Sequence, residues 1–462
     1  MKQKNLRGNR FMLVWLLLVA ALVSAGSLAL VLRGAPLPGG SADNVAPGTP
    51  VATTTADSLQ RPGEALPGRI VFIDGRGQIG TIDSAGENQR QVTAGPRLFL
   101  FPAWSPAGAS IAAIGAEQGG SGVFTFADEE QAEAQELYFD GERAPIYLYW
   151  SPDGRQVSFI AQHENGLGLF LAAAENSAES RLLASGQPLY WDWAGGGQHI
   201  LVHSGSSGPQ ARLELFDVAQ IEEPTEGENL TTPGFFQAPG FSQDGRYIAY
   251  AEVDDERSRW LVVQERDSGE GQRVEHSGAV AFGWSPVEEQ LAFISPDLAA
   301  DEEPFSFHGP LRLMDAATGA VRVLSEDRVI AFFWSPDGEA IAYLTVTRGS
   351  GEQIAGARGE LLPVSRAAQP IQQEFRFTLW LAHISSGQVR RLIDFRPGSL
   401  FVTQFLPFFD QYALSHRIWS PDSTALLLPV VEEGQSRIYV IARDGEAFWP
   451  IVEGQIAFWS HR

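Results

Sequence analysis

The histidines are the first candidates for chemistry, because imidazole binds zinc and transfers protons near neutral pH. Of the eight histidines, His199 and His203 come closest to a zinc-binding spacing, four residues apart in the run HILVH. That run is typical of a β-strand, in which residues four apart lie about 13 Å from one another. Two side chains at that distance cannot share an ion, so we expect no metal and no cofactor.

A catalytic nucleophile is equally hard to find. The chain has no cysteine, which excludes thiol catalysis, thiolate metal sites and disulfides. A serine hydrolase needs a nucleophile elbow of the type G-x-S-x-G. The nearest cluster, Gly205-Ser206-Ser207-Gly208, lacks that pattern and is typical of a hairpin loop. We therefore expect a protein that is not an enzyme.

Carboxylates are abundant but show no calcium-binding pattern. Asp254-Asp255-Glu256 and the run DLAADEE, residues 297–303, fall in expected loops, and neither matches an EF-hand. We interpret both as solvated loops. A carboxylate pair for glycan cleavage does not stand out among 56 acidic residues, so an enzyme with such a pair at a channel mouth stays as the alternative function.

The charge of the chain disfavours a nucleic-acid partner. The first 33 residues contain five cations and no acid, so the remainder carries 28 basic and 56 acidic side chains, a net charge of about −28. Such a surface repels phosphate backbones. We interpret the excess of acid as a means of keeping an exported protein soluble.

The N-terminus predicts a membrane anchor. Residues 1–10 form a basic tail and residues 11–32 an uncharged apolar run. As a helix this run would cross a hydrocarbon core of about 30 Å, with the basic tail in the cytoplasm. Residues 33–66 predict a flexible linker rich in Pro, Gly, Ser and Thr, which leads to an extracytoplasmic domain, periplasmic or at the cell surface. A cleaved signal peptide ending near Ala25 is the alternative.

One pattern recurs along residues 67–462. YWSPDGRQVSFI begins at Tyr149, and near-copies begin at Ala103, Phe333 and Ile418. The aromatic residue of this motif aligns at Trp104, Trp150, Trp193, Phe241, Trp284, Trp334, Trp419 and Trp459. Six of the seven intervals between them span 40–50 residues, the length of a propeller blade, and one spans 85.

The motif also predicts the structure of each repeat. In Ser-Pro-Asp-Gly, Pro presets φ, Asp bonds to nearby backbone and Gly accepts a positive φ, so a tight hairpin is expected. Four short strands per repeat form a sheet that cannot bury its own faces. Radial stacking buries them. This predicts an all-β fold, an eight-bladed β-propeller of four-stranded antiparallel blades, with seven blades as the alternative count.

The two ends of the repeat region predict how the ring closes. The run that begins at Arg69 matches the second strand of a blade, and residues 455–460 match a first strand. We expect the C-terminal strand to complete the first blade, which removes two free sheet edges.

The WSPDG core followed by an apolar strand resembles the bacterial TolB-type propeller repeat, also called WD40-like or PD40. The resemblance covers residues 67–462. It implies a β-propeller and an exported scaffold that binds a protein.

The 85-residue interval contains the candidate site. It holds an insert at 349–374 and an extra segment at 396–415. Five aromatic residues of that segment lie outside the repeat: Phe401, Phe405, Phe408, Phe409 and Tyr412. Under one interpretation the segment folds back and plugs the ring. Under the other it forms an apolar docking surface for a partner.

Together these features predict a single-pass membrane protein with an exported propeller. We expect a non-catalytic scaffold or sensor that binds a protein or a cell-envelope polymer.

Overall fold

The computed structural model describes residues 65–164, 166–175, 180–205, 210–218, 227–234, 238–254, 256–296, 308–348 and 375–462. The predicted tail, anchor and nearly all of the linker lie outside these residues, as do the insert 349–374, the acidic run 297–303 and the Ser206-Ser207 pair. Within the described ranges, no helix combines the length and apolar character needed to cross a membrane.

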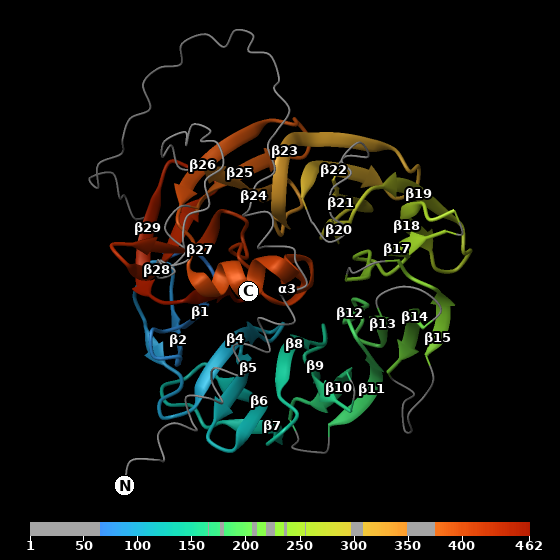
Figure 1. Ribbon diagram of the computed structural model, residues 1–462. Helices are drawn as coiled ribbons and strands as arrows, with labels where there is room; N and C mark the ends of the chain where they lie inside the picture. The colour runs from blue at the N-terminus through green and yellow to red at the C-terminus, as the bar shows by residue number, and fades with distance from the viewer. Residues whose placement is uncertain are drawn as a thin grey trace, which may run out of the picture.

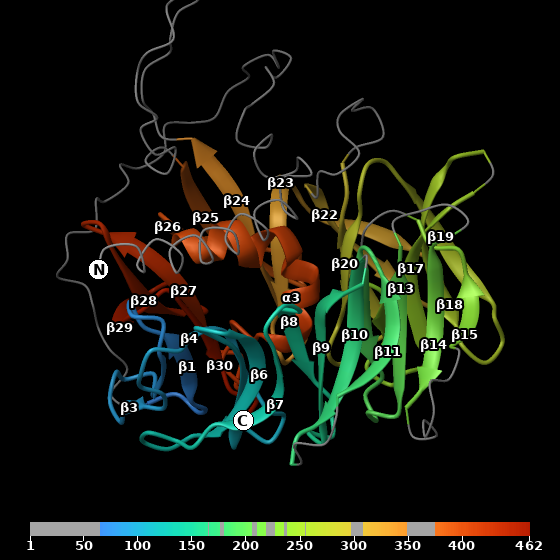
Figure 2. The same cartoon turned by 60° about the horizontal axis from the view of Figure 1, so that its bottom comes forward.

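Antiparallel sheets form a ring around a central helical segment (Figures 1 and 2). Five of these sheets have four strands each. Their strands are β1 (Ile70–Ile73), β2 (Ile79–Ile82) and β3 (Arg90–Gln91) with β30 (Ile456–Trp459); β4 (Leu98–Trp104), β5 (Ser110–Glu117), β6 (Gly120–Ala127) and β7 (Gln135–Asp140); β8 (Pro145–Trp150), β9 (Gln156–His163), β10 (Gly166–Ala173) and β11 (Arg181–Gly186); β12 (Leu189–Trp193), β13 (His199–Ser204), β14 (Arg212–Asp217) and β15 (Glu228–Thr231); and β16 (Gly240–Phe241), β17 (Tyr247–Val253), β18 (Arg259–Glu265) and β19 (Gly271–His276).

A seven-stranded and a three-stranded sheet complete the described part of the ring. The larger contains β20 (Ala281–Trp284), β21 (Gln290–Ile294), β22 (Gly309–Asp315), β23 (Val321–Trp334), β24 (Ala340–Arg348), β25 (Phe375–His383) and β26 (Val389–Phe395), and the smaller contains β27 (Ala425–Glu432), β28 (Gln435–Ala442) and β29 (Phe448–Glu453). The long strand β23 serves two neighbours, because its first part pairs with β22 and its last part with β24. Trp419 bridges Leu426 where an innermost strand of the smaller sheet would lie.

The ring closes through the two ends of the chain. Strand β30 pairs antiparallel with β1, with Ile70 opposite Trp459 and Ile73 opposite Ile456. Beyond the strands, Ser460 N–H donates to the Arg69 carbonyl at 2.7 Å. The predicted pairing of the two ends is therefore present.

The repeated hairpin is held by its own side chains. Ser335 Oγ donates to Asp337 Oδ1 at 2.5 Å and accepts from Ala340 N–H at 3.0 Å, while Asp337 Oδ1 accepts from Glu339 N–H at 2.9 Å. The same Ser-to-Asp bond, at 2.6 Å, recurs at Ser151, Ser242 and Ser420. The repeated aspartates therefore stabilise turns, as the motif predicts.

The motif tryptophans join neighbouring sheets. The indole N–H of Trp150 donates to the carbonyl of Ala103, the residue before Trp104, at 3.0 Å. Four other joints follow the same rule: Trp104 to Phe458, Trp284 to Gly240, Trp334 to Gly283 and Trp419 to Phe333, at 3.0–3.3 Å. Each indole thus fills the space between two sheets and satisfies a carbonyl of the preceding innermost strand.

Candidate functional site

The centre of the ring is occupied by residues 397–416, which we call the plug. It contains a π-helical turn (Phe401–Phe405), a 3₁₀ turn (Leu406–Phe408) and the helix α3 (Phe409–Ser415). The start of the plug is fixed to β27, where Pro397 bridges Val430. Helix α3 then lies against β8, β12, β20 and β23, on both sides of the ring (Figure 1).

The five predicted aromatic residues all belong to the plug, but most of them face inward. Phe401, Phe405, Phe409 and Tyr412 are each at most 5% exposed, and only Phe408 keeps a partly exposed ring. Phe405 stacks on Phe333 with ring centroids 5.9 Å apart. Such contacts anchor the segment to the ring, so the arrangement is that of the plug interpretation.

Further aromatic contacts tie helix α3 of the plug to innermost strands. Phe409 meets Phe332 edge-on at 5.4 Å, and Tyr412 packs on Phe101 at 4.8 Å. Because these partners belong to β23 and β4, the plug bridges different sheets.

Gln411 connects the plug to the free inner edge of β12. Its side-chain oxygen accepts from Trp191 N–H at 3.2 Å, and its side-chain nitrogen donates to the Trp191 carbonyl at 2.9 Å. The amide thus replaces a neighbouring strand and satisfies two backbone groups that would otherwise be buried without partners. Sequence reasoning missed this residue, because nothing local distinguishes it from a surface glutamine.

A buried Ser–His pair lies at the end of α3. Ser415 Oγ is 2.5 Å from His416 Nδ1 and 2.6 Å from the hydroxyl of Tyr147, and His416 Nε2 donates to the Phe101 carbonyl at 3.2 Å. Burial lowers the pKa of His416 to about 4, so the ring is neutral near pH 7. Both imidazole nitrogens are occupied and no carboxylate orients the ring in these contacts, so this pair stabilises the plug and does not form a triad.

Two carboxylates at the centre of the ring have raised pKa values. Burial raises the pKa of Asp192 to about 7, although the N–H groups of Phe241 and Trp193 lower it in part. Burial also raises the pKa of Asp410 to about 6, opposed by backbone N–H groups including that of Ala238. Perturbed acids of this kind often mark functional sites, and no sequence pattern singled out either residue.

The outer side of the plug is accessible. Thr403 and Ala413 are exposed, and Pro407, Phe408 and Leu414 are partly exposed. The surface is therefore mixed, with apolar side chains between polar groups.

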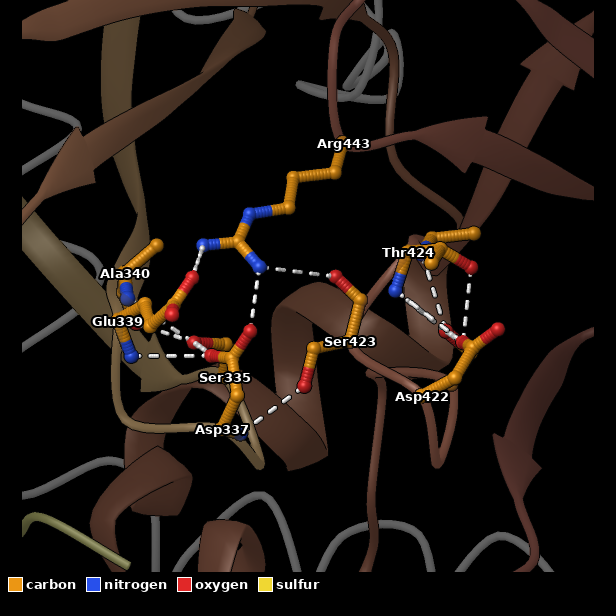
Figure 3. Close-up of polar contacts among 10 residues, drawn as sticks. Ser335, Asp337, Glu339, Ala340, Asp422, Ser423, Thr424 and Arg443 are labelled. Carbon is orange, nitrogen blue, oxygen red and sulfur yellow. Dashed lines mark hydrogen bonds and ion pairs between the residues drawn. The ribbon is translucent and has the colours of Figure 1, made fainter. Parts of the chain in front are cut away.

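A second polar cluster joins the hairpins on either side of the long interval (Figure 3). Arg443 binds Asp337 at 2.5 Å and Glu339 at 3.5 Å, and the Ser423 hydroxyl accepts from Asp337 N–H at 2.9 Å. Burial would raise the pKa of Asp337, but the Ser335 hydroxyl, the Glu339 N–H and Arg443 together lower it. The cluster therefore connects the sheet that contains β24 to the sheet that contains β27 and β28.

The remaining sequence candidates do not gather into a site. His199 and His203 lie at opposite ends of β13, and Asp254 is bonded to Ser258 N–H and to the Trp260 indole within its own hairpin. Across the described ranges, no group of three His, Cys, Asp or Glu residues could hold a metal ion.

Comparison with known proteins places the fold. No family model matches the chain, and no curated protein matches it. Among solved structures, dihydro-heme d1 dehydrogenase NirN in complex with DHE is 15% identical over 88% of this chain and 78% of that chain, with a TM-score of 0.52. The chain folds as a β-propeller.

Other solved structures are more distant. A putative TolB from Agrobacterium tumefaciens is 20% identical over 58% of this chain and 91% of its own, with a TM-score of 0.35. An oligogalacturonate lyase in complex with manganese is 12% identical over 85% of this chain and 86% of its own, with a TM-score of 0.44. At such identities a likeness shows the fold alone, so it does not separate binding from catalysis.

Proposed function

We propose that this protein is a membrane-anchored, exported β-propeller that binds a protein or a cell-envelope polymer and performs no catalysis. The observation that supports this best is the plug, which fills the centre of the ring with the chain's own aromatic side chains. The two central carboxylates, Asp192 and Asp410, are engaged by backbone N–H groups and bind no other ionisable group except the Tyr149 hydroxyl in these contacts.

We infer eight blades. The seven-stranded sheet counts as two blades that share β23, and Trp419 supplies the innermost strand of the sheet that contains β27. The order of the indole bonds supports this count, because each leads from one motif aromatic to the one before it.

The docking surface that we propose is the outer side of the plug. Pro407, Phe408 and Leu414 contribute partly exposed apolar side chains to it, and Thr403 contributes an exposed hydroxyl. Rigid scaffolds commonly carry function on such extra segments. The inward-facing aromatic residues hold this surface in place.

The experiment that tests this function compares partners captured from envelope extract by full-length chains. The variant Phe408→Asp, Leu414→Asp should recover at least about tenfold less of any specific partner, since a buried charge is costly in an apolar contact. Val287→Asp is the matched control, because Val287 is 56% exposed on a hairpin outside the plug. Equal recovery by all three chains would refute the choice of surface.

The alternative function is an enzyme acting on glycans. Its acid and base would be Asp192 and Asp410, because these are the central carboxylates with raised pKa values. Turnover of an envelope glycan that is lost in Asp410→Asn, but kept in the Phe408 and Leu414 variant, would favour this alternative.

A further inference from the structure

One joint of the ring has no indole at all. Phe241 stands where the other joints have tryptophan, so it has no ring N–H to donate to the preceding strand. Its strand β16 has only two residues, Gly240 and Phe241, and pairs with β17 through those two positions alone. The joint between β12 and β16 therefore lacks the bond that holds the regular joints.

Two carboxylates replace the missing bond. Asp192 Oδ2, from β12, accepts from Phe241 N–H at 2.9 Å. Asp410 Oδ2, from the plug, accepts from Ala238 N–H at 3.3 Å. Both contacts hold the short segment 238–241, one from the preceding sheet and one from the centre of the ring.

Other joints that lack a direct indole-to-carbonyl bond use no carboxylate. Trp193 donates to Ser158 Oγ, which in turn donates to the Tyr149 carbonyl. At the last joint, the backbone N–H of Trp459 donates to the Arg417 carbonyl at 2.8 Å, and the Trp459 indole nitrogen has no hydrogen-bond partner among the described residues. The dependence on acids is thus particular to the 238–241 segment among the described joints.

Among the described residues, the surroundings of the two acids contain tyrosines, and neither acid forms an ion pair. Asp192 lies 3.4 Å from the Tyr149 hydroxyl, and it is 5% exposed. The titratable groups that face the two acids are Tyr147 and Tyr149 from β8 and Tyr190 from β12. Tyr412 and His416 of the plug pack on Tyr147, and Arg417 and His461 lie beyond His416. Strands β16 and β20 and residues 329–334 of β23 bring no charged side chain. Within the described part of the chain, no cation therefore compensates either carboxylate when it ionises.

We call the joint between β12 and β16 the seam, and the two contacts that Asp192 and Asp410 make with residues 238–241 the clasp. We propose that the clasp holds the seam closed in a proton-dependent way, and that the seam opens more readily as these carboxylates ionise. The direction follows from solvation. Opening the seam gives each carboxylate water, and the ionised form gains far more from water than the neutral form does. The proposal does not depend on the docking function.

The pH range follows from the pKa values. Both acids titrate near 4 in water and at about 7 and about 6 in the closed ring, so the closed joint binds more protons between these limits. The closed seam is therefore most stable below pH 4 and weakens as the pH rises to about 7. His416 and His461, with lowered pKa values, act in the opposite direction below pH 6.5.

Amide hydrogen exchange on the full chain tests the seam. Protection factors, which correct for the intrinsic effect of pH, should fall at least about tenfold in residues 238–254 between pH 5 and pH 8. The joint between Ala103 and Trp150 is the internal control and should change much less. A seam that shows no dependence on pH, or the same dependence as the control joint, would overturn the proposal.

Two variants separate the clasp from general stability. Asp192→Asn should lower the protection factors at every pH. It should also remove most of their dependence on pH, because the asparagine side chain does not ionise. Asp410→Asn should reduce the slope to a smaller extent, because the pKa of Asp410 is raised less than that of Asp192. If neither variant reduces the slope, the two acids do not form the clasp.

Discussion

The hydroxyl of Ser158 shows how single atoms maintain the ring. It accepts from the indole N–H of both Trp191 and Trp193 at 2.9 Å and donates to the Tyr149 carbonyl at 2.7 Å. All three partners lie in the interior or at its edge, where an unmade hydrogen bond is costly. The Ser158 hydroxyl thus acts as a relay. It connects two neighbouring sheets, as a direct indole-to-carbonyl bond does at other joints.

We predict that Ser158→Ala lowers the free energy of unfolding by about 2–4 kcal/mol, because two indole donors and one carbonyl lose their partner. Urea unfolding followed by tryptophan fluorescence measures the change. Ser121→Ala, at a buried serine of β6 outside this relay, is the control and should cost less than about 1 kcal/mol. A similar cost for both variants would contradict the relay.

The sequence predicts some of these contacts and misses others for a physical reason. The Ser-Pro-Asp-Gly turn is local, so Asp337 and its equivalents could be assigned from the motif alone. Ser158, Asp192 and Gln411 act on residues of other sheets, and their roles depend on which sheets become neighbours. No pattern within one repeat carries that information.

At the scale of elements, the plug is the unit that repetition could not describe. Its five aromatic residues mark the segment, since they fall outside the repeat, but the sequence gives no helical periodicity over a span this short and irregular. Burial of four of these rings follows from the space at the centre of the ring, which only the closed sheet arrangement defines.

The plug predicts a specific sensitivity to acid. His416 is 1% exposed and its pKa is lowered to about 4, so the unfolded chain binds one more proton between about pH 6.5 and pH 4. The contribution of His416 to stability is therefore fully present above pH 6.5 and is lost as the pH falls to about 4. The expected loss is about 2–3 kcal/mol.

We predict that His416→Gln removes this part of the acid dependence. Urea unfolding gives the free energy of unfolding of the wild type and of the variant at pH 7 and at pH 4.5. The difference between the two proteins should change between these pH values. His383→Gln, at the partly exposed end of β25, is the control. If the wild type and His416→Gln lose equal stability on acidification, His416 does not cause the sensitivity.

At the scale of the whole molecule, one strand holds the ring together. Strand β30 supplies the Phe458 carbonyl to the Trp104 indole and buries Ile456, Phe458 and Trp459. The position of this strand was predictable, because a first-strand pattern at the C-terminus matches a missing first strand at Arg69. The number of sheets that share strands was not, since β23 runs through a point where the repeat predicts a break.

We predict that deletion of residues 455–462 costs more than about 5 kcal/mol, because it removes three large buried side chains and leaves β1 as an open edge. Urea unfolding measures this effect, and we expect the cooperative transition to be lost. Addition of a peptide of residues 453–462 should restore part of the transition. An unchanged midpoint after the deletion would contradict closure by this strand.

The bonds between Arg69 and Ser460 have a further consequence for the order of the chain. Since Arg69 and Ser460 meet inside one blade, a short bridge could join them without moving any strand. New ends could then be opened at the exposed turn around Gly387. The rearranged gene would encode a circular permutant, with the same ring of sheets but a different strand order along the chain.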